Sequence, residues 1–318
     1  MRKAVLLYNP DSGRRGARRQ AELEAVLKLL RGAGVDAELV LSHSRSDACD
    51  HTRHAIAAGC DTIFACGGDG TIHNIVQALA NTEVALAILP LGTANALAHD
   101  LSLPLNVIAA AKIALHASPR RVALGHVRYL DFQGNSGERY FIVAAGIGVD
   151  AHLFYKLHAG SKQSLGMAAY YAKAWRMWLT YRMRRFSAEY MSEGKAEPCN
   201  AEATELMAVR IRNFGGVLKE FAPGASLDRD DLRLIVCRTA SRAAYLAYVT
   251  RGLLRQRWTI PGIDLVHSSN VGCQYLSSDN NGKPRQKIYV EADGELIGTL
   301  PAEITAVPGA LTLLAPSP

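Results

Sequence analysis

Strand-like and helix-like segments alternate through the first third of the chain. Short apolar and β-branched segments predict strands at Ala4–Tyr8, Ala37–Leu41, Thr62–Cys66 and Val84–Leu89. Apolar residues at helical spacing predict the helices between them, at Arg18–Arg31, Asp47–Ala58 and Ile72–Ala80. Such alternation is typical of a mostly parallel sheet with helices on both faces, which binds ligands beyond the carboxyl ends of its strands.

The pattern changes near Arg120, after which strand-like segments follow one another with few helices between them. The expected strands are Arg121–Val127 and Arg139–Val143 (joined by the polar loop Gly134–Glu138), Glu205–Arg212, Asp231–Cys237, Lys287–Ala292 and Glu295–Thr299. We therefore predict an α/β domain over residues 1–122 and a largely antiparallel β domain over residues 123–318. An alternative for the extreme C-terminus is that it packs back on the first domain.

Composition limits the class of partner. The formal net charge of +7 favours anionic ligands, and aromatic residues are not interleaved with the basic ones as in nucleic-acid readers, so phosphates or lipid head groups are expected rather than nucleic acid. The six scattered cysteines indicate free thiols in a reducing compartment. The apolar part of the N-terminus is too short for a signal peptide and no segment offers a clean spanning helix, so a cytoplasmic location is expected.

One expected helix, Leu165–Phe186, is rich in aromatic residues and ends in arginines, and the loop before it, Leu157–Ser164, is expected to be mobile. The aromatic residues are Tyr170, Tyr171, Trp175 and Trp178. Such a helix suits a lid or a membrane-docking element. The alternative is a core helix whose arginines extend to water.

Three loops that follow expected strands have phosphate-binding character. They are Asn9–Gly13, Gly67–Thr71 and Leu91–Asn95. Glycine lets backbone N–H groups approach an anion, and Thr71 and Thr93 fall where helices are expected to begin. No G-x-x-x-x-G-K-[ST] loop and no protein-kinase motif set is present, which excludes those two classes.

Several of these motifs together resemble the catalytic domain of diacylglycerol kinases, a family that includes sphingosine and ceramide kinases and small bacterial lipid kinases. The matching segments are Asn9-Pro10-x-Ser12-Gly13, Gly67–Thr71, Leu89–Asn95, Gly146–Ala151 and Asp293-Gly294-Glu295. The resemblance implies a nucleotide on the α/β domain and a lipid in the cleft to the β domain.

The resemblance also implies which residues contact ATP. These are Asn9, Pro10, Ser12, Gly13, Ser42, Gly67, Gly68, Asp69, Gly70, Thr71, Ile72, His73 and Thr93. Asp69 is expected to hold a catalytic Mg²⁺ or to orient the acceptor. The alternative for Asp69 is a carboxylate that caps the following helix.

Asp293 and Glu295 are the candidates for the base that takes the lipid proton. Asp-Gly between two strands is also a strong hairpin signal, which is the alternative explanation. Glu291 alternates with these two residues along an extended chain, so all three are expected to share one face.

The resemblance further implies a structural Mg²⁺ in the β domain, on the backbone carbonyls of Leu227 and Leu232 and the carboxylate of Asp230. The alternative is an acidic turn without metal. The sequence departs from the family at Asn74, where relatives often have glutamate, and at Asp231, where glycine is common.

The expected function is therefore transfer of the γ-phosphoryl of ATP to a lipid hydroxyl, most simply diacylglycerol to phosphatidate. Sphingoid bases, ceramide, monoacylglycerol and phosphatidylglycerol stay open as acceptors. The rivals are an NAD kinase, which shares Gly67–Thr71, and a catalytically silent nucleotide- or lipid-binding regulator. Peripheral contact with a membrane is expected, and a homodimer stays open.

Overall fold

The computed structural model describes residues 1–10, 16–149, 151, 183–195, 197–214, 221–276 and 286–316. Ser12 and Gly13, the loop Leu157–Ser164 and almost all of the expected helix Leu165–Phe186 lie outside the described residues. The last residue of that expected helix is not helical, because Phe186 begins strand β8. None of the described helices is both long and apolar enough to cross a membrane.

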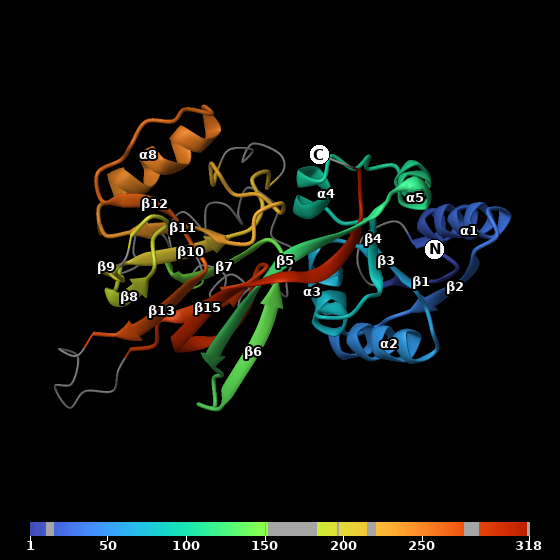
Figure 1. Ribbon diagram of the computed structural model, residues 1–318, viewed down its shortest axis with the longest axis horizontal. Coiled ribbons are helices and arrows are strands. Elements are labelled where there is room, and N and C mark those ends of the chain that lie inside the picture. Colours follow the sequence, from blue (N-terminus) through green and yellow to red (C-terminus); the bar gives the residue numbers. More distant parts are fainter. Residues whose placement is uncertain are drawn as a thin grey trace.

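The first domain contains four parallel strands in the order β4-β3-β1-β2 (Figure 1). They are β1 (Lys3–Tyr8), β2 (Asp36–Leu41), β3 (Thr62–Gly67) and β4 (Ala85–Pro90). All six residues of β3 and of β4 are buried, as expected for strands covered on both faces. The predicted strands are confirmed to within one residue.

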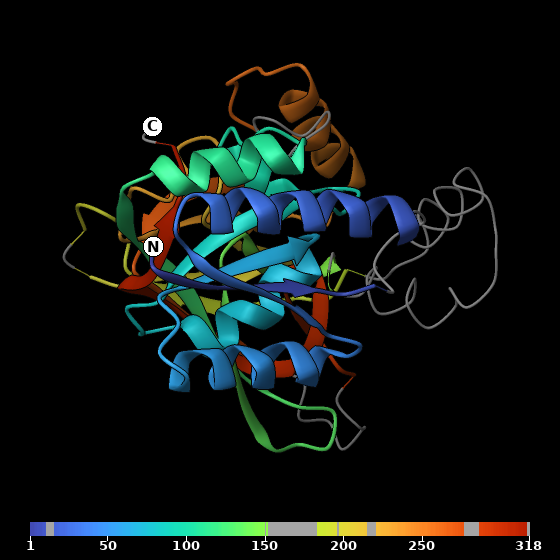
Figure 2. The same ribbon diagram turned by 90° about the vertical axis from the view of Figure 1, so that its right-hand side faces the viewer.

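Helices cover both faces of this sheet (Figure 2). The helices are α1 (Gly16–Gly32), α2 (Arg45–Ala57), α3 (Asp69–Leu79), α4 (Ala96–Asp100) and α5 (Val107–His116). Contacts pair α1 with α5 on one face and α2 with α3 on the other. The sequence patterns missed α5, and they placed the start of α4 at Thr93, three residues too early.

The second domain is largely antiparallel, as predicted. Its strands are β5 (Pro119–Leu130), β6 (Ser136–Phe141), β7 (Ala144–Gly148), β8 (Phe186–Tyr190), β9 (Cys199–Ala203), β10 (Glu205–Val209), β11 (Leu232–Cys237), β12 (Ile263–Ser268), β13 (Asn270–Tyr275), β14 (Tyr289–Ala292) and β15 (Glu295–Leu314). One helix of this domain, α8 (Arg242–Leu253), was not predicted. It begins at Ser241, whose hydroxyl accepts the Ala244 N–H.

Strand β15 joins the two domains into one sheet (Figure 1). Along most of its length it pairs antiparallel with β14, β13 and β5, and near its end Thr312 and Leu313 pair parallel with β4. The sequence predicted only Glu295–Thr299, because Pro301 and Pro308 look like strand breakers. The pairing with β5 shifts register across each of these prolines, and the strand continues beyond them.

The β5–β6 hairpin turns earlier than predicted. The expected loop was Gly134–Glu138, whereas Leu130 pairs with Ser136 and the loop is Asp131–Asn135. The Asp131 carboxylate accepts N–H groups from Gln133 and Asn135, which closes the turn at this point.

Candidate active site

Two glycine-rich loops touch at the carboxyl edge of the parallel sheet. They follow the neighbouring strands β3 and β4, so Gly68 and Gly92 face each other. A Cβ added to Gly92 would lie 2.4 Å from the Gly68 Cα, which leaves no room for any other residue. The loops therefore present one continuous backbone surface, a cradle suited to phosphate oxygens.

The helix after the first loop begins at Asp69, two residues earlier than Thr71, with Gly68 as its N-cap and no side-chain cap. A Cβ on Gly67 would lie 2.2 Å from the Thr71 Oγ1, so this loop also depends on a glycine for its close approach. The N-terminus of the 11-residue α3 thus opens at the cradle, where its dipole favours an anion.

Asn95 shapes the second loop. Its φ of +49° is left-handed, its Oδ1 accepts the Gly92 N–H at 3.0 Å and its Nδ2 donates to the Gly92 carbonyl at 2.9 Å. Helix α4 starts only at Ala96, so Thr93 lies in the loop, exposed, rather than at a helix start as expected.

Asp69 caps a helix, but not the one that it begins. Its Oδ1 accepts the Leu97 N–H at the start of α4, at 3.4 Å. Burial raises the pKa of Asp69, and the charge of Asp293 acts in the same direction. The Asp69 carboxylate is half-buried and also accepts the backbone N–H of Ala96, and its remaining lone pairs suit the Mg²⁺ that phosphoryl transfer uses.

Asp293 lies in a two-residue hairpin turn between β14 and β15, with φ of +48° at Asp293 and +80° at Gly294. Its carboxylate is buried and accepts N–H groups from Ile142, Val143 and Ala144 at 2.8–3.1 Å. The hairpin signal was therefore correct, and the carboxylate is held in place by backbone donors.

His73 links this turn to the first domain. The residue is buried, and its Nδ1 lies 3.2 Å from the Asp293 Oδ2, at hydrogen-bond distance. The only role expected for His73 from the sequence was a contact with the nucleotide. The missed signal is its spacing: Asp69 and His73 are four residues apart on α3 and so share one face.

Glu295 is the more open of the two base candidates. Its side chain is 15% exposed against 1% for Asp293, and its Oε2 lies 3.9 Å from the His73 Nε2, beyond hydrogen-bond distance. The expectation that Glu291 shares one face with Asp293 and Glu295 is wrong, because Asp293 and Gly294 form a turn and the chain is not extended there. The buried Glu291 instead accepts the Gly294 N–H at 2.8 Å and stabilises the turn.

The remaining expected nucleotide residues fall into two groups. Asn9 and Pro10 follow β1 and are half-buried, and Gly70 is exposed on the first turn of α3. Ser42 and Ile72 are buried, and the Ser42 hydroxyl donates to the Ser44 carbonyl at 3.0 Å, while Ile72 is part of the hydrophobic core. The side chain of Ile72 is therefore not available to a ligand.

The loop expected to hold a structural Mg²⁺ is filled by an arginine. Arg210 is fully buried, and its Nη2 donates to the carbonyls of Leu227 (3.4 Å) and Arg229 (2.8 Å), while its Nη1 donates to the Asp231 carbonyl. Burial lowers the pKa of Arg210 to about 10, which leaves it charged at neutral pH.

These residues do not fit the expected metal. The Leu227 carbonyl already accepts from a cation, the Asp230 side chain is exposed, and Leu232 begins β11. A second positive charge beside the guanidinium would be repelled. We infer that Arg210 takes the place of an ion in this loop.

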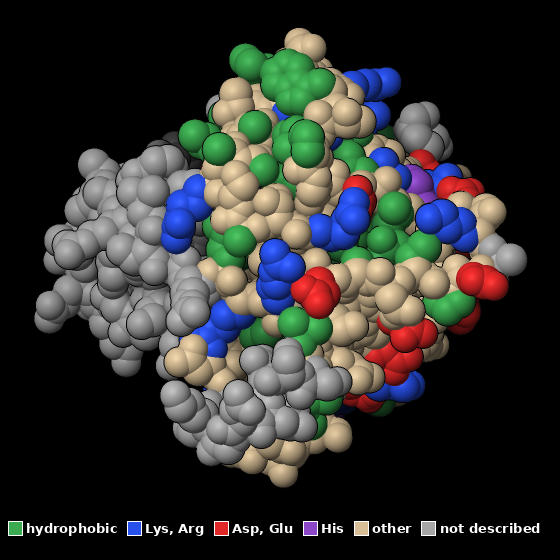
Figure 3. All heavy atoms as spheres, turned by 90° about the vertical axis from the view of Figure 1, so that its left-hand side faces the viewer, with side chains coloured by type: hydrophobic (Ala, Val, Ile, Leu, Met, Phe, Trp, Pro, Cys, Tyr) green, Lys and Arg blue, Asp and Glu red, His purple; other side chains and the backbone are tan. Residues whose placement is uncertain are grey.

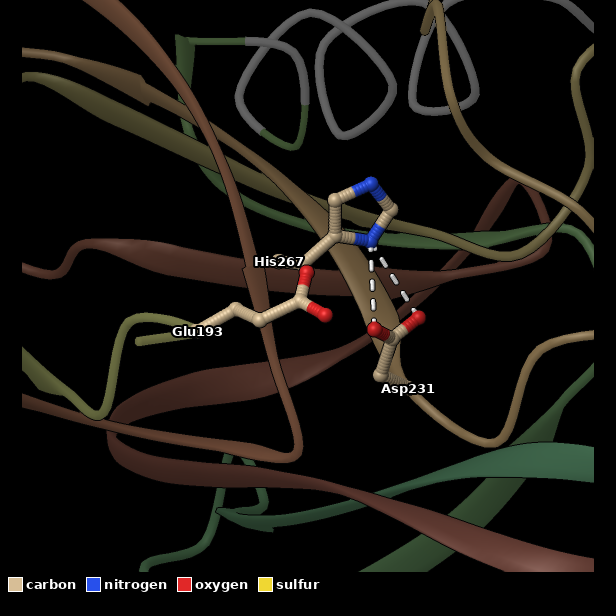
Figure 4. Close-up of side chains that lie close together, drawn as sticks. All are labelled: Glu193, Asp231 and His267. Carbon is tan, nitrogen blue, oxygen red and sulfur yellow. Dashed lines mark hydrogen bonds and ion pairs between the residues drawn. The ribbon is translucent and has the colours of Figure 1, made fainter. Parts of the chain in front are cut away.

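A neighbouring cluster of Glu193, Asp231 and His267 also brings potential ligand atoms within 4.8 Å of one another (Figure 4). The guanidinium of Arg229 pairs with both carboxylates, 3.3 Å from Glu193 and 2.8 Å from Asp231. Arg229 thus offsets part of the acidic charge, and the cluster is explained as an ion-pair network.

Helix α4 ties the two domains together beside the site. The Asp100 carboxylate accepts the N–H groups of Arg212 and Asn213 at 3.0 and 2.9 Å. Burial raises the pKa of Asp100, while these hydrogen bonds oppose that rise. The segment after β10 is therefore fixed to the N-terminal domain.

Comparisons with known proteins agree with this arrangement. Residues 3–127 match the diacylglycerol kinase catalytic domain family, and residues 143–315 match the YegS C-terminal NAD kinase beta sandwich-like domain family. A diacylglycerol kinase of Bacillus subtilis is 28% identical over 95% of this chain and 93% of its own length. One of Mycobacterium tuberculosis is 29% identical over 99% of this chain and 95% of its own length.

Solved structures share the fold. A diacylglycerol kinase structure from Bacillus anthracis superposes with a TM-score of 0.72 at 23% identity, covering 99% of this chain and 97% of its own. The yeast NADH kinase complexed with NADH gives 0.54 at 12% identity, over 99% of this chain and 84% of its own. With both of its domains matched in order along almost its whole length, the chain belongs to the diacylglycerol kinase catalytic-domain family and carries the YegS-type C-terminal β sandwich.

Proposed function

We propose that the protein transfers the γ-phosphoryl of ATP to a lipid hydroxyl, with diacylglycerol as the acceptor and phosphatidate as the product. The observation that carries the proposal is the meeting of the glycine cradle with the Asp293–Glu295 turn through His73. Phosphoryl transfer requires positioned phosphates and a base near the acceptor, and this arrangement supplies both.

The nucleotide lies on the carboxyl edge of the parallel sheet. The phosphates are proposed to contact the backbone of Gly67–Thr71 and Gly92, with Thr93 at the rim and Asn9, Pro10 and Ser42 nearer the nucleoside. Magnesium bound at Asp69 would neutralise charge on the transferred phosphoryl group. We also propose that Ser12 and Gly13 contact the phosphates, on the basis of the sequence alone.

Glu295 is the proposed base, and Asp293 is a positioning residue. A base must be able to reach the acceptor hydroxyl. Both oxygens of Asp293 are already engaged by backbone N–H groups and His73, whereas Glu295 is partly exposed. Of the two carboxylates, His73 lies within hydrogen-bond distance of Asp293 and orients that one.

The proposed domain division is near residue 122, with β5 crossing the boundary and β15 returning to the first sheet. Diacylglycerol resides in a bilayer and ATP in the cytoplasm. We therefore propose that the protein acts as a peripheral enzyme at the cytoplasmic face of a membrane.

The test is transfer of labelled γ-phosphate from ATP with magnesium to a panel of lipids in mixed micelles, with NAD as a parallel acceptor. Labelled phosphatidate supports the proposal, and another labelled lipid changes only the acceptor. Label on NAD alone, or no transfer by a folded protein, contradicts it.

A further inference from the structure

Arginine side chains converge on a cavity between α8 and strands β11 and β12, away from the catalytic carboxylates. The cavity has a volume of about 480 Å³, and its lining includes Arg212, Arg233, Arg251 and Arg257. No carboxylate occurs among the described residues that line it. It adjoins a wider groove of about 970 Å³ that Arg233, Arg251 and Arg257 also line. This concentration of positive charge favours the binding of an anion in the cavity.

Arg251 is the central observation. Its side chain is only 4% exposed, yet its Nε and Nη2 have no hydrogen-bond partner among the described residues. Its guanidinium stacks on the Tyr248 ring, 4.2 Å from the centroid, which fixes its position. The Nε of Arg233 is likewise buried and without a partner in the described part of the chain. Buried guanidinium donors without acceptors are costly, and a bound anion would satisfy them.

Three acids near this cavity are already paired with other cations. Arg229 bridges Glu193 and Asp231, and Asp264 pairs with Arg238 at 2.6 Å. Burial lowers the pKa of Arg233, and the charge of Arg251 acts in the same direction. The two arginines thus repel each other, and a ligand with a phosphate group would relieve the repulsion.

The outer face of α8 is apolar. Leu246, Val249 and Leu253 are spaced as one helical face and are 46%, 38% and 44% exposed, and Leu254 and Trp258 follow at 58% and 46%. We call these five residues the α8 ridge. Figure 3 shows hydrophobic side chains gathered at the top of this face, with Lys and Arg side chains beside and below them. Exposed apolar side chains beside arginines suit contact with the interface of an anionic membrane.

We propose that this cavity binds the phosphate of an anionic phospholipid while the α8 ridge lies in the bilayer interface. The cavity shares no lining residue with the glycine cradle or the Asp293–Glu295 turn, and the proposal does not depend on which lipid is phosphorylated. Charge complementarity favours an anionic phospholipid as the ligand. The buried guanidinium groups would bind its phosphate, and the α8 ridge would lie at the depth where the acyl chains begin.

The test is co-sedimentation without ATP, using vesicles of phosphatidylcholine alone or with phosphatidylglycerol. The wild-type protein should bind the anionic vesicles preferentially. Arg257→Gln, at an exposed position, should weaken binding about fivefold, the effect of about 1 kcal/mol per arginine near an anionic surface. Arg233→Gln should act likewise. Leu246→Ser with Leu253→Ser should weaken binding further, and Arg139→Gln on β6 is the control of equal charge.

Unchanged binding by the Arg257→Gln and ridge variants, or equal binding to both kinds of vesicle, would overturn the proposal. So would stabilisation of the wild-type protein by inorganic phosphate with no vesicle binding, which would identify a site for soluble anions. Phosphorylation of a short-chain soluble diacylglycerol should be unchanged in the Arg257→Gln variant. That measurement separates a failure of docking from a failure of the proposed kinase activity.

Discussion

Replacing Arg210 by alanine tests whether a guanidinium holds the 227–231 loop in place of an ion. The change removes three hydrogen bonds to backbone carbonyls from a fully buried side chain. Carbonyls that lose their donor in the interior keep their desolvation penalty and gain no partner. The loop and the start of β11 should therefore loosen.

The magnitude follows from two opposing effects. Each hydrogen bond from a charged group contributes about 1.5–3 kcal/mol, and desolvation of the guanidinium offsets a large part of that sum. We expect a net loss of about 3–5 kcal/mol in the free energy of unfolding, the range found when one partner of a buried charge contact is removed.

Urea denaturation followed by circular dichroism measures this change. A matched control is Arg53→Ala, which breaks an exposed ion pair with Asp50 and should cost less than about 0.5 kcal/mol. Chelation should leave the wild-type midpoint unchanged, whereas magnesium should restore part of the stability of Arg210→Ala, because its carbonyls are then vacant. A wild-type protein that loses stability on chelation, or a loss below about 1 kcal/mol in Arg210→Ala, would refute the reasoning.

Three further predictions concern the candidate active site. Glu295→Gln should lower the rate of phosphoryl transfer by about 10²–10⁴-fold with little change in melting temperature. Asp293→Asn should lower both the rate and the melting temperature, because it disturbs buried hydrogen bonds to the backbone. Equal changes in melting temperature would contradict the assignment of Glu295 as base and Asp293 as positioning residue. Gly92→Ala should destabilise the protein by about 1–3 kcal/mol in thermal denaturation, while Gly70→Ala, whose Cβ would meet nothing within 4 Å, should be tolerated, and the reverse order would refute the loop contact. Burial raises the pKa of Asp69 in the folded state, so the charged carboxylate opposes folding at pH values above that pKa, and the effect disappears below the pKa of Asp69 in the unfolded chain. Asp69→Asn should therefore raise the free energy of unfolding at pH 7, and this gain should vanish as the solution is acidified. A gain that persists at low pH would show another cause.

The first domain could be predicted from sequence because its signals are local. Fully buried strands such as β3 give continuous apolar segments, and parallel pairing places their glycine loops at one edge without further information. Strand β15 was cut short because proline normally ends a strand, and only the register shifts reveal how the ladder continues.

The contacts that complete the candidate site could not be predicted in this way. His73 and Asp293 are 220 residues apart, and no periodicity connects them. Arg210 follows the apolar strand β10, and nothing in the sequence marks it as buried, since a charged side chain is rarely buried without a partner. Its partners are carbonyls, and these leave no signature in the side-chain sequence.

The pairing of β15 with β4 has a consequence for biosynthesis. Thr312 and Leu313 follow the whole second domain in sequence, yet they pair with β4 and complete the edge of a sheet that begins at Lys3. During translation the β4 edge of the nascent first domain stays uncovered until the residues of β15 have been synthesised and can pair, and an open strand edge invites pairing with other chains. The nascent protein is therefore most exposed to aggregation before β15 pairs with β4, and loss of Thr312 and Leu313 would make that exposure permanent.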